Sequence, residues 1–262
     1  MGTGMYGARN LRGRWRRVAV IGIAATMALG VSACGGDEDN AGGAAGPAGS
    51  DKDSKASAKP SAPGAADGAR LKAASFTDGE KVGRYTASEY VVGGPLGDGY
   101  TAAPAGCQPL VSLAGEVGDP DPAAQVQRQV DVPDEMLGLT VDVTLRSYVN
   151  GGAATVMKAL DKAGRDCAGG FTEQRVVAAA KYLKVEPAEA PAFAAEADGA
   201  KAYRFTILDV KGKEKLYEYL TVVRSGSTTL AFRAEIISTK DIGGVPSEVM
   251  AAQWAKFRAT KG

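Results

Sequence analysis

The stretch LTVDVTLRSYVNGGAATVMKALDKAGRDC, residues 139–167, decides the fold because it changes from the period of a strand to the period of a helix. Apolar and polar residues alternate over residues 139–146, as they do in a strand with one buried face. The glycine pair at residues 151–152 interrupts this pattern. Apolar residues then recur at helical spacing over residues 153–167, and Cys167 lies on the same helix face. We therefore predict a strand that runs to about residue 149 and then a helix.

The residues that follow this helix predict an antiparallel meander and a second helix. Gly212 and Gly226 lie where two hairpin turns are needed, and Pro246 opens a segment with helical spacing. The predicted strands cover residues 182–185, 202–208, 216–224 and 229–237, and the apolar stripe of the last helix comprises Met250, Trp254 and Phe257. Before residue 139 we expect two or three short strands or loops in a Gly- and Pro-rich region. Strands grouped in a run favour an α+β fold, with the helices packed on one sheet in a single domain over residues 71–262.

The first 34 residues have the three zones of a bacterial export signal. Five arginines and no acidic residue precede an uncharged run from Val18 to Val31. A helix of that length rises about 21 Å, short of the roughly 30 Å hydrocarbon core, which disfavours a spanning anchor. The run ends in Val31, Ser32, Ala33 and Cys34, a sequence that resembles the lipobox of bacterial lipoproteins.

The lipoprotein resemblance implies a signal peptide over residues 1–33, cleavage between Ala33 and Cys34, and a diacylglycerol thioether on Cys34. Two acyl chains give lasting anchoring, whereas one gives marginal membrane binding. The alternative is an ordinary secretory signal in which Cys34 is incidental. The pair Arg16-Arg17 permits twin-arginine export, but the residues around it favour the general secretory route. We expect a cell-membrane protein that is lipid-anchored at the extracytoplasmic face.

Residues 34–70 are predicted to form a tether. After Cys34 they are mainly Gly, Ala, Ser, Pro, Lys and acidic residues, with no aromatic residue and no aliphatic residue larger than alanine. Such a segment cannot bury enough apolar surface to offset its chain entropy, so we expect it to be disordered. A flexible chain of this length has a root-mean-square reach of roughly 30 to 36 Å.

Composition excludes several classes of function. Histidine is absent, which excludes Ser-His-Asp and Cys-His catalytic sites and His-based zinc sites. Cleavage before Cys34 would leave 26 basic and 30 acidic residues, a net charge of about −4, which argues against nucleic-acid binding. Neither a Gly-x-Ser-x-Gly nor a Ser-x-x-Lys nucleophile motif is present. We expect no catalytic residue, no metal and no cofactor.

Two cysteines remain once Cys34 is assigned to lipid. An even pair in an exported chain most often forms a structural disulfide, so we predict a bond between Cys107 and Cys167. The closed loop holds about 60 residues and would stabilise the fold by roughly 4 kcal/mol in the loop-entropy model. A redox-active pair is the weaker alternative, because such cysteines are usually close in sequence.

Four aromatic residues are candidate ligand contacts. Tyr203, Phe205, Tyr217 and Tyr219 offer apolar area and hydroxyl groups that could line a cleft. The alternative is that they are sheet core or cross-strand pairs. Residues 119–121, Asp-Pro-Asp, lack the ligand pattern of a calcium loop and indicate a solvated turn. The Lys-rich stretch over residues 209–215 indicates an exposed hairpin tip.

Several of these segments together resemble a known domain. The strand over residues 141–149, the helix that ends at Cys167, the hairpin sequence YEYLTVVRSG at residues 217–226 and the last helix resemble the extracellular sensor-like domain of a mycobacterial receptor Ser/Thr kinase, which also occurs in actinobacterial lipoproteins. The resemblance spans about residues 105–258. It implies a twisted antiparallel sheet with helices against it, disulfide bonds and a ligand cleft. This chain departs from the pattern, since it has one possible disulfide in the domain and no kinase domain.

The expected function is therefore a non-catalytic ligand-binding or sensor-like module on the outer face of the membrane. Its partner would be a small molecule, an envelope component or an envelope protein. One alternative is a structural or accessory partner of another envelope protein, which a large exposed apolar patch would indicate. The other is an envelope enzyme that uses carboxylates, which two acids with raised pKa values in a cleft would indicate.

Overall fold

The structure is a computed structural model, and it describes seven stretches of the chain. These are residues 64–89, 100–112, 120–133, 139–174, 179–209, 211–236 and 239–260. The expected signal peptide, the expected lipidation site Cys34 and residues 35–63 of the expected tether lie outside the described residues.

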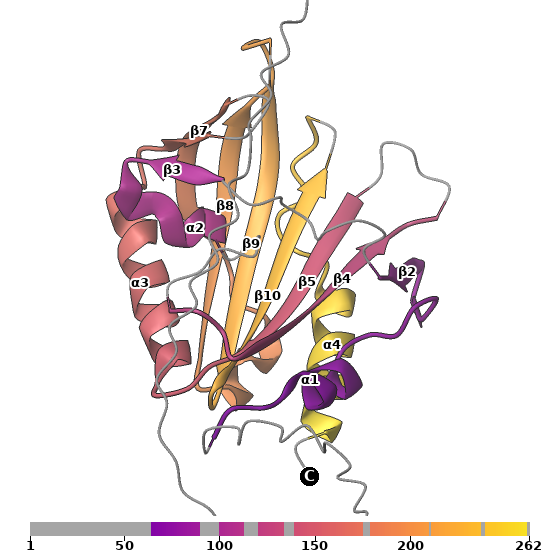
Figure 1. Ribbon diagram of the computed structural model, residues 1–262. Helices are drawn as coiled ribbons and strands as arrows, with labels where there is room; N and C mark the ends of the chain where they lie inside the picture. The colour runs from indigo at the N-terminus through magenta and orange to yellow at the C-terminus, as the bar shows by residue number, and fades with distance from the viewer. Residues whose placement is uncertain are drawn as a thin grey trace, which may run out of the picture. The chain divides into compact units, whose positions relative to one another are not determined.

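The described strands form one antiparallel sheet, which confirms the α+β fold class. The sheet has ten strands in the order β1-β2-β4-β5-β10-β9-β8-β7-β6-β3 within the described part of the chain (Figure 1). The strands are β1 (Lys81–Val82), β2 (Tyr85–Ser88), β3 (Thr101–Ala103), β4 (Ala124–Asp131), β5 (Leu139–Ser147), β6 (Phe171–Gln174), β7 (Ala179–Pro187), β8 (Gly199–Leu208), β9 (Lys215–Ser225) and β10 (Thr228–Ile236). The predicted meander is confirmed, because β8, β9 and β10 are consecutive neighbours in the sheet.

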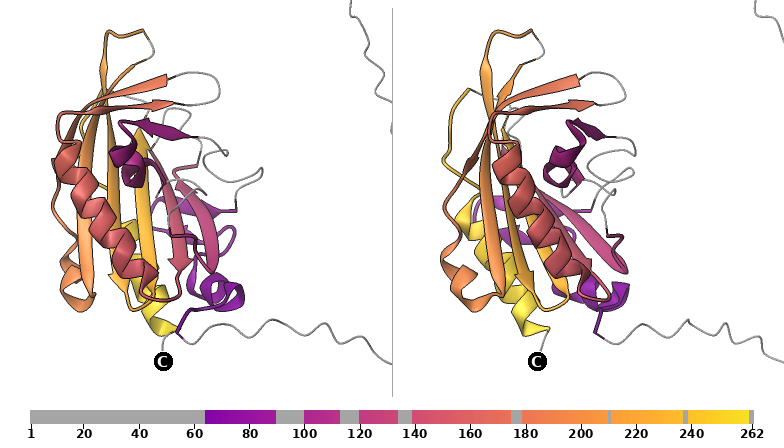
Figure 2. Two further views of the ribbon diagram at one scale, coloured as in Figure 1. Left: turned by 60° about the vertical axis from the view of Figure 1, so that its left-hand side comes forward. Right: turned by 90° about the vertical axis from the view of Figure 1, so that its left-hand side faces the viewer.

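Two long helices lie on opposite faces of this sheet. Helix α3 (Gly152–Asp166) follows β5 as predicted, after Gly151, whose φ of 77° is in the left-handed region that favours glycine. Helix α4 (Ser247–Ala259) follows Pro246. The right-hand view of Figure 2 shows the sheet between the two helices. We name the two sides the α3 face and the α4 face.

Shorter helical elements complete the described fold. They are α1 (Gly68–Ala74), α2 (Gln108–Ser112) and the 3-10 turns η1 (Ala105–Cys107) and η2 (Ala192–Glu196). Helix α1 begins three residues before the expected domain boundary at residue 71, where the Asp67 carboxylate accepts a hydrogen bond from the Arg70 amide at 2.8 Å. Among the residues that the structure describes, none of the helices combines the length and the apolar character that crossing a bilayer requires.

The alternation of side chains along the strands divides the interior into two cores. The α4-face core joins strand residues to helices α1 and α4, and it contains Val141, Val143, Leu145, Tyr219, Leu230, Phe232, Leu71, Met250, Trp254 and Phe257. The α3-face core joins strand residues to α2 and α3, and it contains Tyr182, Tyr203, Phe205, Leu220, Val222, Ala231, Leu110, Val156, Leu160 and Ala163. The predicted apolar stripes of both helices are therefore core residues.

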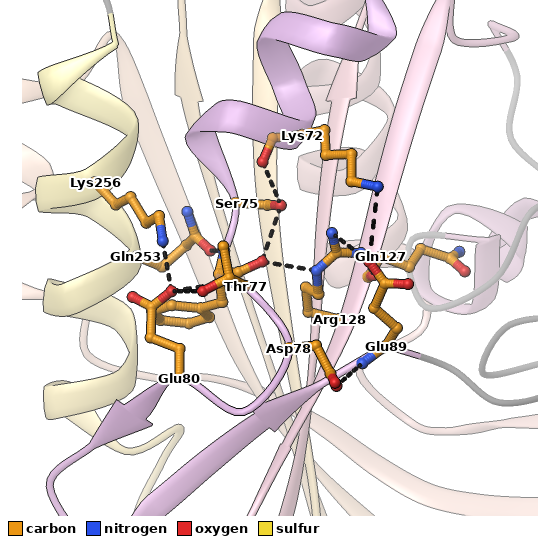
Figure 3. A network of polar contacts seen from close by, with 11 residues as sticks. Lys72, Ser75, Thr77, Asp78, Glu80, Glu89, Gln127, Arg128, Gln253 and Lys256 are labelled. Carbon is orange, nitrogen blue, oxygen red and sulfur yellow. Dashed lines mark hydrogen bonds and ion pairs between the residues drawn. The ribbon is translucent and has the colours of Figure 1, made fainter.

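A polar network fastens the segment after α1 between β4 and α4 (Figure 3). The buried Arg128 side chain donates from Nε to the Phe76 carbonyl at 2.7 Å. From the other side, Gln253 of α4 donates to the Ala74 carbonyl at 2.6 Å and accepts from the Phe76 amide at 3.2 Å. Residues 75–80 lack a regular partner strand, so these side chains satisfy backbone groups that would otherwise be buried without partners.

Candidate functional site

A cleft of about 660 Å³ lies on the α4 face and is the candidate site. One wall is the segment over residues 188–192, which connects β7 toward β8, and another is the loop over residues 242–247, which leads into α4. The floor comes from β2, β5, β8, β9 and α4. The lining comprises Arg84, Tyr85, Leu139, Ala188, Glu189, Ala190, Pro191, Ala192, Tyr203, Tyr219, Thr221, Ile242, Gly243, Gly244, Val245, Pro246, Ser247 and Met250.

The deep part of the cleft is mostly apolar. Tyr85, Leu139, Val245 and Met250 are all buried residues of the α4-face core. Thr221, which is 4% exposed, adds a hydroxyl to this lining. A ligand group that forms a hydrogen bond with this hydroxyl would gain affinity.

Tyr219 holds the wall over residues 242–247 against the floor. Its hydroxyl donates to Asp241 and accepts from the amides of Ile242 at 2.9 Å and Gly243 at 3.3 Å. Burial, and then the hydrogen bond to the Asp241 carboxylate, raise the pKa of Tyr219 to about 12, so its hydroxyl stays protonated. The same hydrogen bond is the main cause that lowers the pKa of Asp241. This side of the cleft is therefore preorganised by one tyrosine.

Arg204 links the same loop to β7. Its guanidinium donates to Glu186 at 2.6 Å and to Asp241 at 2.5 Å, and it lies 5.7 Å from the centre of the Tyr217 ring. The hydrogen bond from Arg204 is the main cause that lowers the pKa of Glu186. These two acids near the cleft are thus held ionised and already paired with a cation.

The segment after β7 is fastened to α4 beyond the cleft. Phe193 stacks on Trp254 with ring centroids 5.2 Å apart, and the Arg258 guanidinium lies 5.8 Å from the Trp254 ring. Arg258 also forms an ion pair with Glu196 at 2.8 Å. The wall over residues 188–192 is therefore anchored at its far end, although its own side chains are small.

The four predicted aromatic contacts are divided between the two faces of the sheet, and two of them, Tyr203 and Tyr219, are among the residues that line the cleft. Tyr203 and Phe205 point to the α3 face, where the Tyr203 hydroxyl donates to the Leu160 carbonyl at 3.3 Å. Tyr217 and Tyr219 point to the α4 face. The reason is the register of β8 and β9, which pairs Tyr203 with Leu220 and Phe205 with Glu218. Tyr219 lines the observed cleft, whereas Tyr203 borders it while its ring packs against α3.

A buried ionic cluster on the α3 face was not anticipated from the sequence. Arg233, 2% exposed, is paired with Glu218 and donates to the Tyr182 hydroxyl at 2.7 Å. The Tyr182 hydroxyl lies 3.1 Å from Oε2 of both Glu218 and Glu173. Burial disfavours the charge on Arg233, but attraction by Glu218 and the neighbouring groups outweighs it and raises the pKa of Arg233 well above its ordinary value. A signal was present in the sequence, because Arg233 and Glu218 occupy inward positions of apolar strands.

The predicted disulfide is confirmed. Cys107 and Cys167 are bonded, with Cα atoms 5.9 Å apart, and both residues are buried. The bond joins η1 to the C-terminal end of α3. It therefore holds the α2 region on the α3 face, on the opposite side of the sheet from the candidate cleft.

The remaining candidate sites have simpler outcomes. In the stretch over residues 209–215, residues 211–215 are exposed at the turn between β8 and β9, and the Asp209 carboxylate accepts hydrogen bonds from the amides of Lys213 at 2.6 Å and Glu214 at 2.9 Å. Asp119 lies outside the described residues, so the expected turn over residues 119–121 is described only in part. No group of three potential metal ligands occurs within the described stretches of the chain.

Comparison with known proteins adds information on the fold. No family model and no curated protein matches the chain. Among solved structures, the extracellular domain of PknH from Mycobacterium tuberculosis matches with a TM-score of 0.50 and 10% sequence identity, over 75% of this chain and 97% of that domain. The two share a fold. The resemblance to a mycobacterial kinase extracellular domain is therefore confirmed at the level of the fold.

A second solved structure is more distant. An uncharacterized protein from Mycobacterium smegmatis matches with a TM-score of 0.36 and 15% identity, over 76% of this chain and 97% of that one.

Proposed function

We propose that the protein is a lipid-anchored, extracytoplasmic module that binds a ligand in the cleft on the α4 face without chemical turnover. The observation that carries the proposal is the cleft itself, whose walls are fixed by Tyr219 and by the Phe193–Trp254 stack. A concave site with a mostly apolar floor and a few polar groups has the character of small-molecule and peptide sites.

The anchor rests on the lipobox at residues 31–34 and on the tether-like composition that follows it. Replacement of Cys34 by alanine removes the only sulfur that could carry the diacylglycerol. We expect this variant to appear in the soluble fraction of cells and to lose metabolic labelling with a fatty-acid analogue. Continued membrane retention and labelling of the variant would overturn the anchor.

Binding without turnover is supported by the state of the acids near the cleft. Asp241 and Glu186 have lowered pKa values and are paired with Arg204. A general acid needs a raised pKa, and lowered values are the opposite of what a two-carboxylate enzyme requires. The observation favours a binding site over the alternative of a carboxylate-based envelope enzyme.

Cleft-filling variants test the function. The Cβ position at Gly244 meets no other atom within 4 Å, so Gly244→Phe adds a ring at the cleft wall without a clash at Cβ. Gly106 is equally open but lies on the α3 side, so Gly106→Phe is the matched control. In a thermal-shift screen against lipids and cell-wall fragments, a ligand should stabilise the wild type and Gly106→Phe but not Gly244→Phe. Detectable turnover of a stabilising compound would instead establish the enzyme alternative.

A further inference from the structure

We infer that the cleft takes an extended peptide segment that is uncharged along its length. This inference rests on the proposed binding function and names its ligand class. Three features carry it: the direction of the cleft across the sheet, the main-chain character of its walls, and the placement of its charged side chains.

The cleft is long and runs across the strands. Its lining extends from Tyr85 on β2 to β8, where Tyr203 borders it. These strands are separated by β4, β5, β10 and β9 in the sheet order. Five strand spacings of about 4.8 Å give a length of roughly 24 Å along the sheet. An extended chain at about 3.3 Å per residue covers this length with roughly seven residues.

Both walls present main-chain groups. Residues 188–192 carry only Ala, Pro and one Glu, and the facing loop contains Gly243 and Gly244, so small side chains leave the backbone accessible. Within the described part of the chain, the amides of Glu189 and Ala190 on one wall and of Gly244 and Val245 on the other have no hydrogen-bond partner. Backbone donors on two sides of a groove match the alternating donors and acceptors of an extended peptide.

The charged residues of the lining, Arg84 and Glu189, lie toward the two ends of the cleft. Arg84, in the turn between β1 and β2, lies toward one edge of the sheet, and Glu189, after β7, lies toward the other. Both are exposed, whereas the floor between them has no charged side chain. A charged group at the centre of the ligand would be desolvated without compensation, which disfavours it. A peptide with its amino terminus near Glu189 and its carboxylate near Arg84 would match both ends.

The residues that line the cleft also argue against two other ligand classes. Sugar hydroxyls need several polar side chains as hydrogen-bond partners, yet the lining contains no Asn, Gln or Asp, and its charged residues, Arg84 and Glu189, lie toward the two ends. Lipid acyl chains need a continuous apolar tunnel, yet the main-chain groups of both walls and the Thr221 hydroxyl interrupt the apolar surface. A peptide uses both the apolar floor and the polar walls.

The test uses the full chain and a pool of heptapeptides made from Ala, Gly, Val, Leu, Ser, Thr and Pro with free termini. Peptides that co-elute with the protein are identified by mass spectrometry, and their Kd values are measured by calorimetry. Chitotetraose and palmitoyl lysophosphatidylglycerol are the sugar and lipid probes. The variants are Gly244→Phe and Ala190→Trp, one on each wall, with Gly106→Phe as the control, and thermal melts establish that each variant is folded.

We expect the wild type and Gly106→Phe to bind the same peptides with equal Kd, and the two cleft variants to bind at least tenfold more weakly. Thr221→Val should weaken binding by about two- to tenfold, the effect of one hydrogen bond. Acetylation and amidation of the peptide ends should weaken it by about two- to fivefold, as expected for exposed ion pairs.

Three results would overturn the inference. Peptide binding that both cleft variants retain would place the peptide elsewhere. Cleft-dependent binding of chitotetraose or the lysolipid, with no peptide bound, would disprove the ligand class while leaving the binding function intact. If no probe bound in a cleft-dependent way, both the peptide inference and the cleft as a binding site would fail.

Discussion

Replacing Gly164 by alanine tests whether the Tyr203 ring is clamped against α3. A Cβ atom at Gly164 would lie 2.3 Å from Cε1, 2.5 Å from the hydroxyl oxygen and 2.6 Å from Cζ of Tyr203. The tyrosine cannot withdraw without cost, because it is 5% exposed and its hydroxyl donates to the Leu160 carbonyl. The substitution therefore forces α3 and β8 apart or moves a buried ring.

Two opposing effects determine how much Gly164→Ala changes the free energy of unfolding. Alanine has a higher helix propensity than glycine and would stabilise α3 by up to about 1 kcal/mol. Overpacking a core contact costs about 1 to 3 kcal/mol, and losing the Tyr203 hydrogen bond costs about 1 kcal/mol more. The packing cost wins, so we expect Gly164→Ala to destabilise the domain by about 1 to 3 kcal/mol. In a domain of this size that lowers Tm by roughly 2 to 12 °C.

Urea unfolding followed by circular dichroism measures the change, with an unaltered m-value as the sign that the two end states are the same. The matched control is Gly68→Ala in α1, where the added Cβ meets no atom within 4 Å. We expect the control to be neutral or slightly stabilising. In a Tyr203→Leu background, Gly164→Ala should also become neutral or stabilising. If Gly164→Ala in the wild type behaved like Gly68→Ala, the close approach of Tyr203 to α3 would be refuted.

Three other substitutions probe the bonds that hold the two faces. Changing Cys107 and Cys167 together to alanine opens a loop with a sequence separation of 60 residues. Urea unfolding should show that the free energy of unfolding falls by about 4 kcal/mol. A fall of less than about 1 kcal/mol would contradict the loop-entropy argument. Arg233→Ala removes the cation that compensates the buried carboxylates. The free energy of unfolding should fall by about 3 to 5 kcal/mol in the same assay. An unchanged free energy of unfolding would show that the cluster is hydrated. The pKa of Asp241 is lowered from 3.8, chiefly by Tyr219, so its carboxylate stabilises the fold above that pH and ceases to do so as the pH falls through the lowered pKa. Asp241→Asn should therefore be less stable than wild type in melts at pH 7, and the difference should shrink as the pH falls below 3.8. A difference that does not shrink in acid would exclude this origin.

The elements that could be predicted from the sequence are those whose signal is local. The strand–helix transition over residues 139–167 and the stripe of α4 follow from periods of 2 and 3.6 residues, and both are observed. Helix α1 was missed because its seven residues carry a weak apolar pattern, and it is held by long-range contacts such as that of Gln253 with the Ala74 carbonyl. Such long-range contacts produce no periodic pattern in the sequence.

The division of the four aromatic residues between the two faces has a specific physical cause. Residues two apart in a strand share a face, so Tyr203 lies on the same face as Phe205, and Tyr217 lies on the same face as Tyr219. Whether the two pairs share a face depends on the register of β8 and β9, which is set by the length of the turn between Leu208 and Lys215. A shift of one residue moves every side chain of a strand to the other face. Composition and alternation contain no information on that shift. The cleft walls could not be predicted from the sequence either, because their mostly small side chains give no pattern that marks a site.

The two faces of the sheet differ in a way that bears on where a ligand can act. On the α3 face, the Cys107–Cys167 bond, the Gly164–Tyr203 contact and the Arg233 cluster all hold elements by buried contacts that a ligand would have to break. On the α4 face, residues 188–192 are held at their two ends, by the hydrogen bond from the Ala188 amide to the Ala202 carbonyl and by the Phe193–Trp254 stack, and their side chains other than Glu189 are small. A ligand can therefore be accommodated there without loss of core packing, which is the energetic reason to place binding on the α4 face.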